Sequence, residues 1–285
     1  MRRILVAMSD THAGHRLGLM PPDITLYDED EQGNARPWTP QQTAVQQWLW
    51  RCYLEDVAAV VTLAGGDPVC LLHNGDLTQG SKYGTELVST RKSDQYDIAV
   101  ANFAPWLALT NLGAVRLSHG TGSHADYEAT ASHVVCQALR ALHPGADVAV
   151  VRHGLLNVDG CRVDYAHHGP SAGMRQWTSG NQCRYYLRSL MNDELLRRRE
   201  PPRLVVRSHF HTHIRETVRV MGDREYVSDI VVTPAYCGLS EYAQQVTRSG
   251  YLIGCGLVAA EIIDGDLVDV HRYHRVVDLR REESL

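Results

Sequence analysis

Short apolar segments of this chain end repeatedly in aspartate or histidine. Residues 4–8, ILVAM, run directly into Asp10 and His12, and PVCLLHNGD at 68–76 ends in Asp76. Apolar runs of this length are typical of buried strands. Two strands that both deliver carboxylates at their carboxyl ends are typical of an α/β sheet with a site along one edge. The pattern therefore predicts an α/β fold whose chemistry lies at that edge.

Helices and further strands account for most of the remaining chain. Residues 13–40 are rich in Pro, Gly, Asp and Glu without periodicity, which indicates an extended surface loop. We expect helices over 39–65 with Thr39 and Pro40 as cap and first turn, within 84–112 with a break at Pro105, over 127–142 and over 181–199. Strands are expected in 113–126, 146–160, 161–169, 203–213, 225–233 and 256–276, the last with a hairpin turn at Asp264-Gly265. Because no repeat and no low-complexity linker is visible, we interpret 1–285 as a single domain with a loop and helix insertion around 13–60.

Composition narrows the class of protein. The seven cysteines form an odd set without a C-x-x-C pair, most of them in apolar segments, which indicates free thiols in a reducing, hence cytoplasmic, compartment. No apolar run approaches the roughly 20 residues needed to cross a bilayer, so we expect no signal peptide and no membrane partner. A net charge of −5 argues against a strongly basic protein.

Histidines and carboxylates gather in five short clusters, each in a strand or the loop that follows it. They are Asp10-Thr11-His12, Asn74-Gly75-Asp76, Gly122-Ser123-His124, His167-His168-Gly169 and the run from His209 to His213. In an extended segment, residues two apart project to the same side, so Asp10 and His12 can converge on one ion. The same holds for His209 with His211, or for His211 with His213. Carboxylate and imidazole donors without thiolates suit Zn, Mn or Fe and argue against a structural zinc finger.

The order of these clusters, D-x-H, G-D, G-x-H, H and H-x-H, resembles that of the calcineurin-like metallophosphoesterases from residue 8 to about 213. The resemblance implies a four-layer sandwich, in which two mixed sheets packed face to face are flanked by helices. It also implies two divalent metal ions, Mn, Zn or Fe, at the carboxyl ends of the strands. The segment 13–40, the WTPQQTAVQQWLW helix and the HHGP turn are similar in a general way to phosphoesterases carried by phages and prophages.

Site residues follow from the resemblance by position. Asp10 and His12 match ligands of the first metal, Asp76 matches the carboxylate that bridges both metals, and His124 matches the histidine that protonates the leaving group. One of His167 and His168 should bind the second metal, and the sequence leaves the choice open.

Two registers compete for the last motif. The register with His209 and His211 as metal ligands is preferred, because Ser208 then lies directly after the strand RLVVR, where the family has glycine. His213 is the alternative ligand if the register slips by two.

Three positions depart from the family pattern. Asp126 comes one position later than the acidic residue that often follows the histidine. Ser123 stands where the family has an asparagine that binds the second metal, and Ser208 stands where it has glycine. A serine hydroxyl is a shorter and weaker ligand than an amide carbonyl, so the second metal should bind less tightly. Replacement of Ser123 by asparagine should then tighten it.

The resemblance implies a metal-dependent hydrolase of phosphate esters, in which a hydroxide that bridges two metals attacks the phosphorus. A phosphodiester is favoured as substrate, with DNA or a nucleotide among the candidates, and the oligomeric state stays open. The rival hypothesis is a catalytically weak metal-binding scaffold or interaction module with a degenerate second site. A metal-dependent amidohydrolase fits less well, since such enzymes begin with His-x-His after the first strand.

Overall fold

The strands form two mixed sheets, which confirms the α/β class. A computed structural model describes residues 1–284 except 83, 125–129, 172, 174–175 and 240–251. One sheet has six strands in the order β13-β12-β1-β4-β5-β6. Their bounds are β1 Arg2–Met8, β4 Val69–His73, β5 Leu112–Ser118, β6 Asp147–Val151, β12 Leu252–Ile263 and β13 Asp266–Asp278. In this sheet β1, β4, β5 and β6 run parallel, whereas β12 and β13 are joined by antiparallel pairing.

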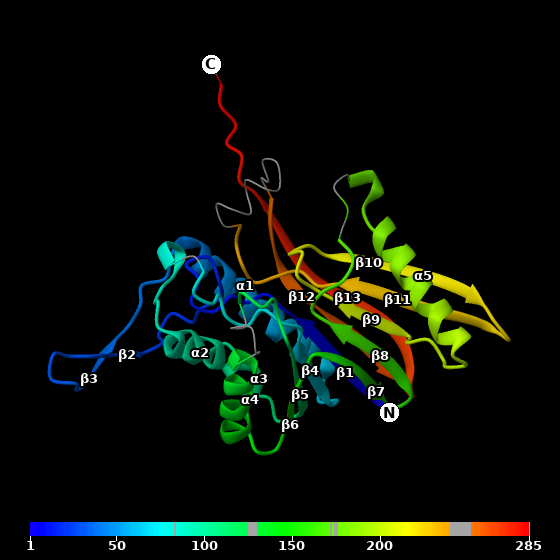
Figure 1. The fold of residues 1–285 in the computed structure, drawn as a ribbon, viewed down its shortest axis with the longest axis horizontal. Helices are drawn as coiled ribbons and strands as arrows, with labels where there is room; N and C mark the ends of the chain where they lie inside the picture. The colour runs from blue at the N-terminus through cyan, green and yellow to red at the C-terminus, as the bar shows by residue number, and fades with distance from the viewer. Residues whose placement is uncertain (83, 125–129, 172, 174–175, 240–251, 285) are drawn as a thin grey trace.

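The second sheet has five strands in the order β10-β11-β9-β8-β7. Their bounds are β7 His153–Val158, β8 Cys161–Ala166, β9 Leu204–Arg207, β10 Ile214–Met221 and β11 Glu225–Val232. Here β8, β9 and β11 run parallel, and β7 and β10 are the antiparallel edges. A separate hairpin of β2 Leu26–Glu29 and β3 Ala35–Trp38 projects from the body of the molecule (Figure 1).

The first strand shows how sequence builds the layers. Its residues alternate between two hydrophobic clusters: Ile4 and Val6 pack in the cluster with the helices, and Leu5 and Ala7 pack between the sheets. A strand buried on both faces must be apolar at every position, which is why 4–8 shows no polar alternation. Burial of the larger side chains, those of Ile4, Leu5 and Val6, contributes roughly 1.5–3 kcal/mol each.

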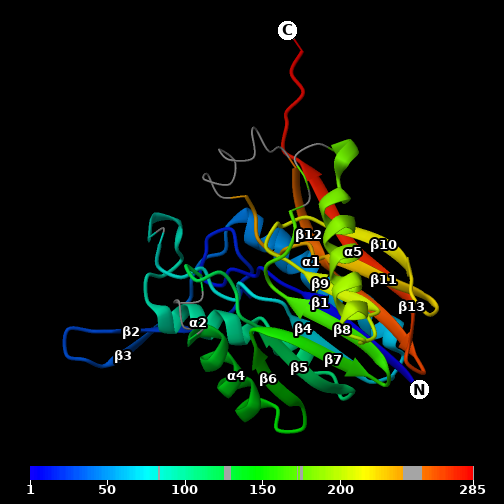
Figure 2. The ribbon, with the colours of Figure 1, turned by 45° about the vertical axis from the view of Figure 1, so that its right-hand side comes forward.

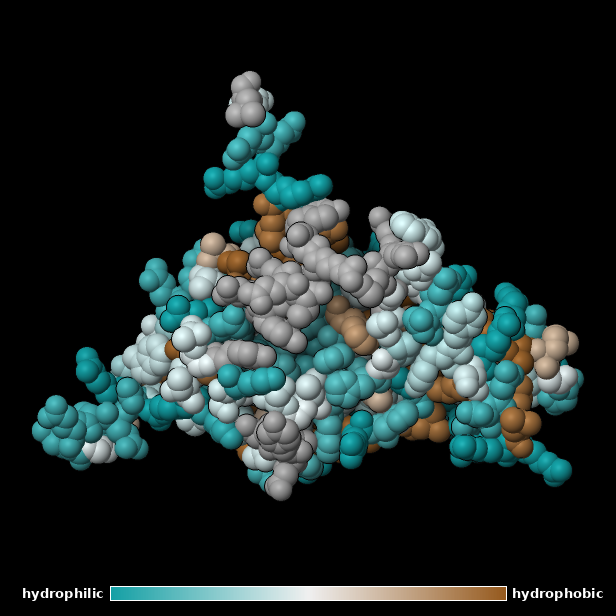
Figure 3. All heavy atoms as spheres, turned by 45° about the horizontal axis from the view of Figure 1, so that its top comes forward, coloured by the Kyte–Doolittle hydropathy of each residue, from teal (hydrophilic) through white to brown (hydrophobic). Residues whose placement is uncertain are grey.

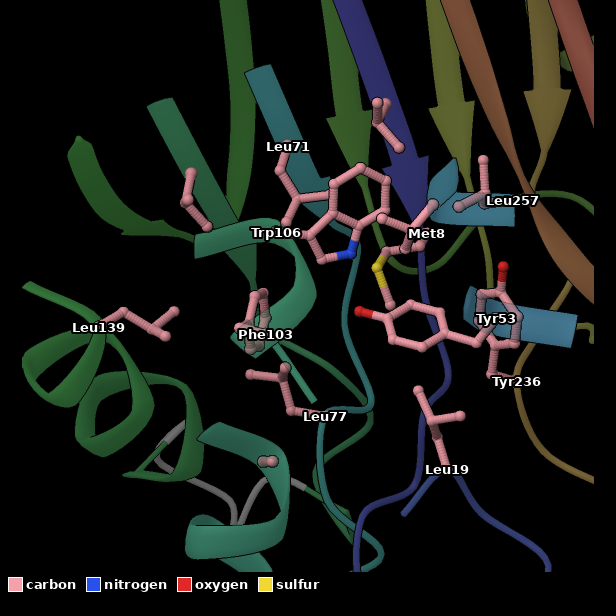
Figure 4. Close-up of a cluster of buried hydrophobic side chains, with 14 of the residues drawn as sticks. Met8, Leu19, Tyr53, Leu71, Leu77, Phe103, Trp106, Leu139, Tyr236 and Leu257 are labelled. Atoms are coloured by element: carbon pink, nitrogen blue, oxygen red, sulfur yellow. The ribbon is translucent and has the colours of Figure 1, made fainter. Parts of the chain in front are cut away.

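Helices cover the outer faces of both sheets, as Figures 1 and 2 show. They are α1 Ala44–Ala64, α2 Lys92–Ala101, α3 Ala104–Leu107, α4 Thr130–Leu142 and α5 Asn181–Leu196. On the six-stranded sheet, Tyr53 of α1, Trp106 of α3 and Leu139 of α4 belong to one cluster with Leu71 of β4 (Figure 4). On the other sheet, α5 packs through Cys183, Leu187 and Met191 against β9, β10 and β11. The order of layers is therefore helices, sheet, sheet, helix.

The segment before α1 differs from the expected loop and cap. The helix begins after Thr43, whose side chain forms a capping box with Gln46, and not at Thr39-Pro40. Within 13–40, Leu19 and Met20 are completely buried, and the β2–β3 hairpin follows. A few apolar residues in a polar segment were enough to draw part of it into the core.

Two further differences concern strands. The expected strand at 146–160 is divided between the sheets, because β6 belongs to the first and β7 to the second. Strand β10 was not predicted, and it directly follows the histidine run. The turn at Asp264-Gly265 and the helix break near Pro105 occur as expected. Asp126 and residues 127–129 of the expected helix at 127–142 lie outside the described residues.

On the face in Figure 3, hydrophilic residues predominate and the hydrophobic ones form scattered groups. In the part of the chain that the structure describes, no helix combines the length and the hydropathy that a transmembrane segment needs.

Candidate metal centre

The five clusters meet at one edge because of strand direction. The carboxyl ends of β1, β4 and β5 lie together in one parallel set, and those of β8 and β9 lie together in the other. The loop after β1 hydrogen-bonds to the loop after β4, with Asp10 N donating to Gly75 O at 3.0 Å and His12 N to Asp76 O at 3.1 Å. The loop after β9 joins them, since His209 N donates to Asp10 Oδ2 at 3.3 Å.

The local backbone at this edge is left-handed, which corrects the argument from strand alternation. Strands β1 and β9 end at Met8 and Arg207, before the functional residues. Eight non-glycine residues of the described chain have positive φ, and five of them belong to this edge: Asp10, His12, Asp76, His209 and His211. A left-handed backbone is unfavourable for side chains other than glycine, and such strain concentrates at functional sites.

The first donor cluster contains Asp10, His12 and His211. His211 Nε2 lies 3.2 Å from Asp10 Oδ1 and 3.3 Å from His12 Nε2, and His12 Nε2 lies 3.8 Å from Asp10 Oδ1. His12 Nδ1 donates to Gln79 Oε1 at 2.8 Å, which leaves the lone pair of Nε2 free for a ligand. Asp76 approaches Asp10 and His12 closely enough to share an ion with them.

Burial and charge shape this cluster. Burial alone would raise the pKa of Asp10, but His167 and His211 hold that pKa below its ordinary value. Burial, reinforced by His124, lowers the pKa of His12 well below its ordinary value, so His12 is neutral and able to coordinate. Asp10 and His12 are thus a carboxylate and a neutral imidazole, the forms that bind metals.

The second donor cluster contains Asp76, His167 and His209. His167 Nε2 lies 3.0 Å from Asp76 Oδ2, and His167 Nδ1 donates to Asn74 O at 2.7 Å. His209 Nδ1 lies 4.0 Å from the same carboxylate oxygen. Burial would lower the pKa of His167, but Asp76 and Asp10 raise it to about 9. The raised pKa means that His167 holds a proton between these carboxylates. A bound metal ion would displace that proton and interact with Asp76 and Asp10 in its place.

Thr121 completes the second cluster and was missed in the sequence. Its amide donates to Asp76 Oδ1 at 2.6 Å and its hydroxyl to Asp76 Oδ2 at 3.1 Å. The same hydroxyl lies 3.2 Å from His209 Nδ1 and 3.4 Å from His167 Nε2. The hydroxyl of Thr121 therefore faces the second cluster. The dipeptide Gly120-Thr121 could have indicated this residue, because a glycine followed by a hydroxyl residue occurs there just as it does at Gly122-Ser123.

Together these residues could hold metal ions. Their donor atoms form three groups, Asp10-His12-Asp76, His12-His211-Cys237 and His167-His168-His209, each with all atoms within 4.8 Å of one another. Asp10 Oδ1 is buried without a hydrogen-bond partner, which is costly unless a cation satisfies it. The donors are oxygen and nitrogen atoms for the most part, as borderline divalent ions prefer.

His124 lies at the rim of the first cluster. Its ring stands edge-on to that of His12, with centroids 4.7 Å apart. His124 Nδ1 donates to Gln79 O at 2.7 Å, which leaves Nε2 as the nitrogen available to a bound molecule. Gln79 holds both histidines, through its side chain and its carbonyl.

The geometry bears on the two choices that the sequence leaves open. His168 is exposed, and its ring contacts those of His167 and His209 at 4.9 and 4.7 Å, whereas buried His167 approaches Asp76 directly. The geometry therefore favours His167. His213 lies away from both clusters, with its ring 5.9 Å from that of His274, so the arrangement fits the register of His209 and His211.

A buried hydrogen-bond chain ties the two sheets beneath the centre. Ser118 Oγ donates to Asn74 Oδ1 at 2.6 Å, Asn74 Nδ2 donates to Ser208 Oγ at 2.7 Å, and Ser208 Oγ lies 2.8 Å from Thr233 Oγ1. Ser9 joins Thr233 at 2.7 Å. Ser208 thus has a structural role at the position where a glycine was expected.

Comparisons with known proteins add little to this geometry. No protein-family model matches the chain, and no curated protein matches it. A solution NMR structure of Thermotoga maritima protein TM1076 matches at 14% identity over 62% of this chain and 87% of that one, with a TM-score of 0.29. A likeness at that level carries no argument about fold or function.

Proposed function

We propose that the protein is a metal-dependent phosphoesterase with the four-layer sandwich of the calcineurin-like metallophosphoesterases, and that a phosphodiester is its substrate. The observation that carries this proposal is the position of Asp76 between two donor clusters. Asp76 approaches Asp10 and His12 on one side and lies 3.0 Å from His167 on the other. A carboxylate so placed suits a bridge between two cations.

The donor set defines the role of each residue in the proposal. Asp10, His12, Asp76 and His211 would hold one divalent ion, and Asp76, His167 and His209, with Thr121, would hold the other. Such a pair supplies a nucleophilic hydroxide at neutral pH and neutralises the charge on phosphoryl oxygens. Manganese, zinc and iron all suit these donors.

His124 is the proposed general acid. Its Nδ1 is held by the Gln79 carbonyl, so a proton on Nε2 would be available to the leaving oxygen. The edge of the ring rests against His12, which fixes its orientation. The chain thus offers a positioned proton donor beside the proposed metal pair.

The ester itself is a matter for experiment. Among the described residues, no arginine hydrogen-bonds to the donor clusters, and Arg207, just before them, bonds instead to Asp164 at 2.5 Å and Tyr186 at 2.7 Å. A panel of single-stranded DNA, cyclic nucleotides and aryl phosphates would therefore decide between nuclease, nucleotide phosphodiesterase and phosphatase.

The test is turnover of a chromogenic phosphodiester by purified protein with Mn²⁺ or Zn²⁺. We expect turnover that a chelator abolishes, that Asp76→Asn removes and that His124→Ala reduces at least about 100-fold. His213→Ala is the matched control, since it is a histidine from the same run outside the clusters. Tight metal binding without turnover of any ester would instead favour the metal-binding scaffold.

A further inference from the structure

Cys237 lies beside the first donor cluster, although no sequence motif predicts a thiol there. Its Sγ is within 4.8 Å of donor nitrogens of His12 and His211. The side chain is 6% exposed, so solvent reaches it poorly. One sulfur and two imidazole nitrogens therefore lie close together.

The carboxylate supplies an independent observation. Asp10 is fully buried, and its Oδ1 has no hydrogen-bond partner while it lies 3.2 Å from His211 Nε2 and 3.8 Å from His12 Nε2. An unsatisfied carboxylate oxygen aimed at two imidazole nitrogens is the arrangement expected around a cation.

The backbone fixes the thiol in this place. Tyr236 N donates to Asp10 O at 3.2 Å, and Gly238 N donates to Leu17 O at 2.8 Å, one on each side of Cys237. The Tyr236 side chain is buried and donates to Asp56 Oδ2 at 2.7 Å. The segment that carries Cys237 is therefore fastened to the loop that carries Asp10.

We propose that Cys237 is a thiolate ligand of the first metal, together with Asp10, His12 and His211. As the sulfur–metal bond forms, the thiol proton leaves to solvent, and no electrons are transferred. The proposal rests on the metal centre of the proposed function and not on hydrolysis.

The thiolate gives the two positions different preferences. Sulfur with imidazole favours borderline or soft ions such as Zn²⁺ and Cd²⁺, whereas Mn²⁺ and Mg²⁺ prefer oxygen. The second cluster, with Asp76, His167, His209 and Thr121, has no sulfur donor among its described residues. We therefore expect a mixed centre with zinc in the first position and manganese tolerated in the second.

Cadmium binding to the metal-free protein tests the ligand directly. We expect thiolate-to-cadmium charge-transfer absorption that saturates near one equivalent in the wild-type protein, is lost in Cys237→Ser and is retained in Cys136→Ser. Cys136 is a suitable control because it is also buried, at 4% exposure, and packs on α4 away from the metal centre. Circular dichroism checks that each variant is folded.

Affinities complete the test. Cys237→Ser should weaken Zn²⁺ binding roughly tenfold or more and leave Mn²⁺ binding nearly unchanged. Absence of the absorption in the wild-type protein, its persistence in Cys237→Ser, or equal losses for both ions would overturn the proposal. These measurements use metal ions alone, so they are independent of turnover. The proposal for Cys237 can therefore be overturned while phosphodiester hydrolysis is supported, and hydrolysis can be absent while Cys237 still binds metal.

Discussion

The Nε2 atoms of His12 and His211 lie 3.3 Å apart, although 199 positions separate the two residues in the chain. His12 Nδ1 hydrogen-bonds to Gln79, so His12 Nε2 is the free nitrogen. This atom and His211 Nε2 both lie near Asp10 Oδ1, at 3.8 and 3.2 Å. Although burial alone would lower the pKa of His211, Asp10 raises it, so the site favours a positive charge at this point. A proton or a metal ion between the two nitrogens would supply that charge.

Loss of His211 should therefore remove the first metal. We expect His211→Ala to lower metal content by about one equivalent per chain, because a ligand is lost and Asp10 keeps an unsatisfied charge. His213→Ala should retain full occupancy, since the His213 ring lies against His274. Metal analysis after dialysis measures both. The opposite result, with His213 required and His211 dispensable, would shift the ligand register by two.

Thr121 should control the second metal. We expect Thr121→Val, which keeps the shape and removes the hydroxyl, to weaken the second ion roughly tenfold. Ser123→Ala should change little, and Thr121→Asn should restore or raise the affinity. Isothermal titration with Mn²⁺ resolves the second binding event. If Ser123→Asn raises the affinity for the second ion and the Thr121 variants leave it unchanged, the expectation that residue 123 controls this ion is correct.

The extent of the sequence prediction can be judged from these residues. Strand ends were predictable because the apolar runs are short and stop at polar residues, so Asp10, Asp76 and the histidines at 167 and 209 were assigned to one edge. The reason offered for pairing Asp10 with His12 was wrong, since both have positive φ instead of an extended backbone. Local periodicity does not report a left-handed turn at a residue other than glycine.

Thr121 and Cys237 show a second limit. Counting back one position from His124 gave Ser123, whereas Thr121, three positions before His124, is the residue that hydrogen-bonds to Asp76. Cys237 follows β11, a strand without a recognisable motif, and reaches the centre through contacts with the loop after β1. Contacts between segments more than 200 positions apart depend on tertiary packing, which no local pattern encodes.

Gly120 should be intolerant of any side chain. A Cβ at this position would lie 2.1 Å from Asp76 Oδ1 and 2.4 Å from Asp76 N. We expect Gly120→Ala to displace the Asp76 carboxylate and to abolish binding of both metals and turnover, while far-ultraviolet circular dichroism stays close to wild type. Gly113→Ala in β5, the strand that precedes Gly120, is the control, because its nearest neighbour would be Val69 O at 3.9 Å. Normal metal content in Gly120→Ala would show that Asp76 is not the bridging ligand.

The hydrogen-bond chain beneath the centre should contribute to folding stability. Ser208→Ala removes the hydroxyl between Asn74 and Thr233 and leaves buried polar groups without a partner. The expected loss is about 1–3 kcal/mol in the free energy of unfolding, measured by urea denaturation in chelator. Ser208→Gly should cost at least as much. An unchanged midpoint would mean that Asn74 and Thr233 find other partners.

His73 should make the metal-free protein sensitive to acid. Burial lowers the pKa of His73 to about 4, from an ordinary value of 6.5, and the side chain is completely buried. Between these values the unfolded state binds more protons at this residue, so stability falls as the pH is lowered from 6.5 toward 4. The lowered pKa of His73 corresponds to a loss of about 3 kcal/mol in the free energy of unfolding across that range. His73→Gln should therefore have a shallower pH dependence of the urea midpoint across that range than the wild-type protein, whatever its stability at pH 7. Parallel curves for the two proteins would show that His73 does not titrate in this way.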